Sequence, residues 1–146
     1  MGIEMSDNTF RKGTLNRHVD QDRIVKAFQL LANHGINRTA YNIIGLPDQT
    51  EESIVSTIEF NIKLNPDVSS VAYYSVYSGT NLGDKNKINY EENLNNMDAQ
   101  IRSKIINHSK IDKNLFKFYK NNFNYFIKNK MLNYNKMRTE WLQKFN

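Results

Sequence analysis

Cysteine is absent from this chain of 146 residues, and proline occurs only twice. Without cysteine the chain can form no disulfide, no thiolate zinc site and no cysteine nucleophile, and it cannot itself ligate an iron–sulfur cluster. No apolar run is long enough to span a bilayer, and the first residues lack the basic and apolar regions of a signal peptide. We therefore expect a cytoplasmic location with no membrane span.

Charge and aromatic residues divide the chain in two. Residues 1–80 carry seven Lys/Arg and nine Asp/Glu, whereas residues 81–146 carry thirteen and six. Nine of the seventeen aromatic residues lie in residues 110–146. We predict one part at residues 1–83 and a basic, aromatic-rich helical extension at residues 84–146.

The first part alternates helix and strand signals. Asp20 is a suitable N-cap for an amphipathic helix, which Gly35 closes in a left-handed conformation. An apolar strand follows at residues 39–44 and ends abruptly at the turn Gly45-Leu46-Pro47. In α/β proteins, the loop at the carboxyl end of a strand is the usual place for a ligand.

A second helix and a further strand complete the pattern. Thr50 is placed to cap the helix, Pro66 ends it, and residues 68–77, rich in Val and Tyr, predict the strand. Gly2-Ile3 reads as the end of an earlier strand. Strand, helix, strand, helix, strand with short loops predicts a parallel sheet with right-handed crossovers. Three strands leave bare edges, so we expect part of a larger barrel or sheet.

The extension reads as helical throughout. An apolar stripe at residues 94–105 predicts one helix, and residues 113–131 and 134–145 predict two more. Aromatic residues at helical spacing are available for packing on a core.

Four segments read together resemble the second half of the radical S-adenosylmethionine barrel, most closely in the branch that contains a cobalamin-binding domain. These segments are Gly2-Ile3-Glu4, Leu15-Asn16-Arg17-His18-Val19, Asn42-Ile43-Ile44-Gly45-Leu46-Pro47 and Tyr77-Ser78-Gly79-Thr80. The resemblance implies an α/β fold: a partial (half) TIM-like barrel with parallel βαβαβ order, followed by the helical extension. The three predicted strands of this chain correspond, in order, to the fourth, fifth and sixth strands of the family's barrel.

The resemblance also implies a binding site for S-adenosylmethionine. A polar residue at the end of the fourth strand meets the ribose, and Glu4 stands there with a carboxylate that can accept from both hydroxyls. Arg17 matches the arginine that pairs with the methionine carboxylate, which guanidinium can bind bidentately. Ile43 matches the apolar residue that packs on the adenine. The backbone that reads the adenine edge falls at Ser75 and Val76.

A further ribose-binding residue of the family falls at Tyr41 or Asn42. Strand alternation places Tyr41 on the face of Ile43 and Asn42 on the other face. The sequence leaves both residues open as candidates.

The chain departs from the family pattern at several points. Met5-Ser6 replaces the usual Ser-Gly after the glutamate, Asp48-Gln49 replaces Gly-Glu at the turn, and Ser78 stands where relatives favour proline. The Cys-x-x-x-Cys-x-x-Cys loop that holds the family's 4Fe–4S cluster is missing. We therefore expect that cluster, and any cobalamin, to belong to a missing N-terminal part of the full-length protein.

If the cluster lies in a missing part of the protein, this chain is an incomplete barrel and has no activity of its own. The chain alone is expected to be inactive, with no catalytic or metal-binding residue of its own, and its substrate is not implied. Its partner is expected to be the missing half of the barrel or another copy of itself. Ile43 and Val71 are expected to be exposed as barrel-interior residues, so sedimentation should reveal self-association.

The alternative interpretation is an inactive remnant that acts as a binding module through its basic tail. Lysines there interleave with Phe116, Tyr119, Tyr125 and Trp141, as they would in a stacking platform for nucleic acid. The same pattern is typical of an ordinary amphipathic helix, and no nucleic-acid motif accompanies it. We therefore favour docking of these helices on the missing part of the barrel over nucleic-acid binding.

Overall fold

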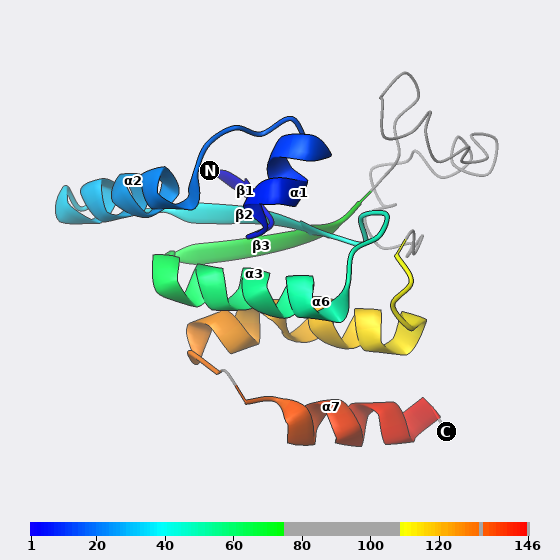
Figure 1. The fold of residues 1–146 in the computed structure, drawn as a ribbon. Helices are drawn as coiled ribbons and strands as arrows, with labels where there is room; N and C mark the ends of the chain where they lie inside the picture. Colours follow the sequence, from blue (N-terminus) through cyan, green and yellow to red (C-terminus); the bar gives the residue numbers. More distant parts are fainter. Residues whose placement is uncertain (75–108, 132, 146) are drawn as a thin grey trace, which may run out of the picture.

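The computed structural model describes residues 1–74, 109–131 and 133–145. Three strands, β1 (Gly2–Glu4), β2 (Thr39–Ile44) and β3 (Val68–Tyr73), form a parallel sheet in the order β1-β2-β3 (Figure 1). The predicted α/β class and the parallel pairing of the second and third strands are confirmed. The end of the third predicted strand, residues 75–77, lies outside the described residues.

The described helices begin and end within a few residues of their predicted bounds, except the first, at a position where no helix was predicted. They are α1 (Asn8–Gly13), α2 (Gln21–Asn33), α3 (Glu51–Leu64), α6 (Lys113–Lys128) and α7 (Asn135–Leu142), with a 3₁₀ turn η2 at Gln143–Phe145. Gly35 follows α2 at φ 67°, and the Thr50 hydroxyl accepts from Ser53 N at the start of α3. Asn65 ends α3 at φ 48°, immediately before Pro66. The helix predicted at residues 94–105 lies outside the described residues.

Among the described residues, helices cover one face of the sheet and leave the other uncovered. Ala40, Asn42 and Ile44 of β2 are buried and point toward the helices, whereas Tyr41 between them is 53% exposed. On β3, Val68 is 56% exposed and lies on the same face as Tyr41. This second face, with Tyr41 and Ile43 on β2, is called the open face below.

One predicted member of the open face lies elsewhere. Val71 pairs in register with Asn42, so its side chain points toward the helices and is buried, which makes its predicted exposure wrong. Ile43 pairs with Ala72 and does lie on the open face, half-buried. A shift of one residue in the register of β3 would exchange the residues on its two faces. Only the pairing of β3 with β2 shows which register the chain adopts.

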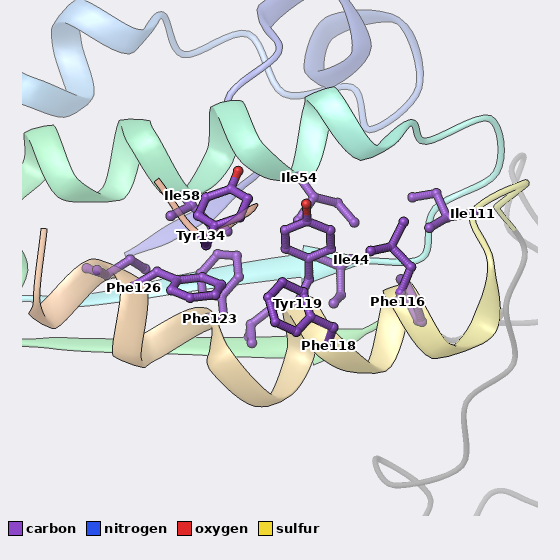
Figure 2. Packing of buried hydrophobic residues seen from close by; sticks show 13 residues of the cluster. Ile44, Ile54, Ile58, Ile111, Phe116, Phe118, Tyr119, Phe123, Phe126 and Tyr134 are labelled. Carbon is purple, nitrogen blue, oxygen red and sulfur yellow. The ribbon is translucent and has the colours of Figure 1, made fainter. Parts of the chain in front are cut away.

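The aromatic helix α6 packs on this chain's own sheet and helix α3. Phe116, Phe118, Tyr119, Phe123 and Phe126 are buried in one cluster with apolar residues of β2 and α3 (Figure 2). The expectation that these residues dock on a missing part of a barrel is therefore wrong for α6. Figure 1 shows α7 on the far side of α6 from α3. Within the described ranges no helix is long and apolar enough to cross a membrane.

Candidate functional site at the carboxyl end of β1

Glu4 ends β1 with an unusual backbone and a folded-back side chain. Its φ is 63°, a left-handed conformation that non-glycine residues adopt at a cost. A Cβ placed on Gly2 would lie 2.5 Å from Glu4 Oε1, so the carboxylate lies over Gly2. Gly2 pairs in register with Tyr41, which carries the exposed side chain of β2. The missing side chain of Gly2 thus makes room for a carboxylate on the open face.

Arg17 meets this carboxylate from the connection between α1 and α2. Its backbone N donates to Arg11 O at 2.8 Å, which folds the connection back onto the end of α1. Its Nη2 donates to Glu4 Oε1 at 3.4 Å, and the two side chains are 58% and 14% exposed. The structure therefore brings together two site residues that stand thirteen positions apart in the chain. A single long contact of this exposure contributes less than about 1 kcal/mol, so a ligand can replace it.

Two further predicted residues lie on the open face of the next strand. Tyr41 presents its ring to solvent, and Ile43 is half-buried two residues along β2. With Glu4 and Arg17, the open face thus carries a carboxylate, a guanidinium, a phenol and an aliphatic side chain. Such a set suits a ligand that has hydroxyl, anionic and flat apolar parts.

Asn42 lies on the opposite face, beneath α3. It exchanges two hydrogen bonds with Asn61, at 3.1 and 2.8 Å, and donates to Ser70 O at 3.2 Å. Asn61 also donates to Thr57 O at 2.8 Å. The pair satisfies buried amides and fixes α3 on the sheet, so the Asn42 side chain does not face a ligand on the open face. Of the two candidates on β2, Tyr41 alone faces that side.

The last two predicted site residues, Ser75 and Val76, lie outside the described residues. β3 is described as far as Tyr73, which pairs with Ile44 at the carboxyl end of β2. The backbone proposed to read the adenine edge therefore has no described geometry.

The turn after β2 is a packed loop. Gly45 adopts φ 88°, and a Cβ placed there would lie 2.6 Å from Cζ of Phe116 on α6. Gly45 N also donates to Oε1 of the buried Gln49 at 2.6 Å, and Leu46 is fully buried. These contacts explain the glycine and the apolar residues of the turn without a ligand.

A cavity of about 500 Å³ lies beside this turn, at the start of α3. Its acidic lining is largely engaged in structural contacts: Asp112 caps α6, and Thr50 and the backbone lower the pKa of Glu52. Glu51 accepts from Tyr119 OH at 2.5 Å and from Arg138 Nε at 2.8 Å. These acids hold helix ends and neighbouring helices, as expected near a helix N-terminus.

The sequence reasoning missed two residues at the end of β1. Gly2 was treated as strand rather than as space for a carboxylate, and only the three-dimensional contact reveals that role. The sequence analysis did not single out Arg11, yet it is 2% exposed in the structure. A charged residue four positions after the N-cap Asp7 gives no signal of burial in the sequence.

No protein-family model matches the chain, and a search of curated proteins found no match.

Proposed function

We propose that the chain is the C-terminal part of a radical S-adenosylmethionine barrel, whose open face binds that molecule. The observation that carries the proposal is the meeting of Glu4 and Arg17 on the open face of a parallel sheet, which no described helix covers, at the carboxyl end of β1. Glu4 would accept from the ribose hydroxyls, Arg17 would pair with the methionine carboxylate, and Ile43 would pack on the adenine. Tyr41 would line the ribose side.

The reactive chemistry would come from a 4Fe–4S cluster held by cysteines of the missing N-terminal part of the barrel, because this chain has no cysteine. That cluster would supply the electron for reductive cleavage of S-adenosylmethionine. The residues of this chain would bind and orient the molecule and would not react. On this proposal the chain is a binding half, inactive alone.

The two edges of the sheet favour a partner at β1. On β3, Tyr74 N donates to Ile44 O, so the backbone of Val71 points to the outer edge. Lys120 of α6 covers that edge, with its Nζ donating to Val71 O at 2.5 Å. In the described part of the chain no element pairs with the outer edge of β1. A lysine on a strand edge opposes further pairing, so we place the remaining barrel strands beside β1.

Calorimetry with S-adenosylmethionine tests the proposal. We expect the chain alone to bind at about millimolar affinity, because few contacts offset the entropy of association. A partner that carries Cys-x-x-x-Cys-x-x-Cys and the remaining strands should tighten binding. Arg17→Ala should abolish measurable binding, whereas Arg23→Ala, an exposed arginine on α2, should leave it unchanged.

Three outcomes would overturn the proposal. Micromolar affinity of the chain alone would identify a self-sufficient binding protein instead of half a barrel. Equal binding by the Arg17→Ala variant would show that the roles assigned by resemblance are wrong. Absence of binding in every mixture would favour the alternative, a remnant that acts through its basic helices, where Tyr125 is 51% exposed between lysines.

A further inference from the structure

Near the end of β1, two of three neighbouring cations form ion pairs and the third, Arg11, does not. Lys12 pairs with Asp20 at 3.0 Å, and Arg17 pairs with Glu4 at 3.4 Å. Arg11, in the same region, has no carboxylate within 4.0 Å among the described residues. Of these three cations, Arg11 is therefore the one that has no paired carboxylate in the described part of the chain.

That charge lies on a nearly inaccessible side chain. Arg11 is 2% exposed, its Nη1 donates to Asn8 Oδ1 only at 3.5 Å, and its Nε is buried without a partner in the part of the chain that the structure describes. Burial lowers the pKa of Arg11, although the nearby Glu4 carboxylate acts to raise it. Burial of an uncompensated cation destabilises a fold, and buried N–H groups without a partner are rare in native proteins. An acceptor for Arg11 would relieve both penalties.

Arg17 supplies a second set of donors at the same place. The hydrogen bond from Arg17 N to Arg11 O holds the two backbones together, and the Arg17 side chain pairs with Glu4, whose charge also acts on the pKa of Arg11. In the described part of the chain Arg17 uses one guanidinium nitrogen, and its side chain is 58% exposed. Two guanidinium groups beside one carboxylate leave a net charge of +1, which attracts an anion.

We propose that Arg11 and Arg17 form an oxyanion site at the carboxyl end of β1, with Arg11 Nε as its buried donor. Guanidinium N–H groups are suited to carboxylate and phosphoryl oxygens, which form short charge-assisted hydrogen bonds with them. The site takes the anionic group of a small ligand and goes beyond the proposed function, which assigns no role to Arg11. Identification of that group as the methionine carboxylate of S-adenosylmethionine rests on the proposed function.

The test uses the full chain and simple probes. Sodium acetate and sodium phosphate are titrated separately at constant ionic strength, with sodium chloride as the balancing salt. The readouts are the Arg11 Nε–H resonance and the midpoint of thermal unfolding. We expect saturable binding of at least one probe, seen at Arg11 Nε–H. Acetate would select a carboxylate ligand and phosphate a phosphoryl ligand.

Matched variants separate a binding role from a structural one. Arg11→Met should weaken the preferred probe about tenfold or more, while its ligand-free unfolding midpoint stays equal to or above that of the wild type. Arg23→Met, on the exposed side of α2, should change neither quantity. The inference is overturned if neither probe shifts Arg11 Nε–H, or if Arg11→Met lowers the ligand-free midpoint and leaves binding unchanged.

S-adenosylmethionine as a third probe keeps the two proposals apart. If acetate or phosphate binds through Arg11 and S-adenosylmethionine does not bind, the oxyanion site stands and the proposed function falls. If S-adenosylmethionine binds equally to the wild type and to Arg11→Met, the proposed function stands and the role of Arg11 falls.

Discussion

Gly45 shows how one residue can join segments that are distant in the chain. Its φ of 88° suits glycine, and its missing side chain admits the ring of Phe116 from α6. The sequence indicated a turn at this position but could not indicate the ring, because Phe116 stands far along the chain in a segment with many aromatic residues. A glycine in the sequence indicates a local turn, whereas the contact that requires this glycine comes from a distant residue.

Gly45→Ala should therefore destabilise the fold by about 1–3 kcal/mol, through backbone strain and displacement of a buried ring. Gly13→Ala is the matched control, because a Cβ at Gly13 would meet nothing within 4 Å. Gly13 lies at the end of α1, where alanine should be neutral or stabilising by up to about 1 kcal/mol. Urea unfolding of both variants measures the difference, and equal stabilities would contradict this explanation of the turn.

Helix ends were predictable from the sequence, but the faces of the strands were not. Thr50 and Gly35 act within a few residues of themselves, so their signals survive without tertiary context. Val71 was assigned to the wrong face because Ser69 and Ser70 give β3 no clear alternation before it. Asn42 could not be placed because its partner Asn61 comes from α3. Pairing between elements decided both residues.

The contact of α3, α6 and α7 is expected to depend on Tyr119. Its hydroxyl donates to Glu51, which also binds Arg138 of α7. Tyr119→Phe should cost about 1 kcal/mol at neutral pH. Tyr125→Phe, an exposed residue of the same helix, should cost nothing measurable in urea unfolding.

Alkaline pH gives this contact a second signature. Burial and the hydrogen bond to Glu51 raise the pKa of Tyr119, and burial raises the pKa of Tyr134 to about 12. Because the folded pKa values exceed the unfolded value of 10.0, this stability is present below pH 10 and is lost as the pH rises through the folded values. Tyr119→Phe should reduce the loss of unfolding free energy above pH 10. Parallel pH curves for variant and wild type would contradict the assignment.

At the scale of the molecule, the part of the chain that the structure describes is a sheet with helices on one side and an open face on the other. α6 completes the covered side and closes the outer edge of β3 through Lys120. The sequence predicted the parallel order and the pairing of strands, because both follow from alternating elements with short connections. The sequence did not predict that the aromatic extension fills this chain's own core. The apolar stripe of an amphipathic helix shows that the helix packs on something, but it does not identify the surface.

Amide chemical shifts can map where S-adenosylmethionine binds on the chain. Added S-adenosylmethionine should shift the resonances of Gly2, Glu4, Arg17, Tyr41 and Ile43, which belong to the open face and the end of β1. The buried resonances of Asn61 and Phe123, beneath the helices, should stay in place. Absence of shifts at Glu4 and Arg17, or shifts confined to α6 and α7, would show that the open face does not bind S-adenosylmethionine.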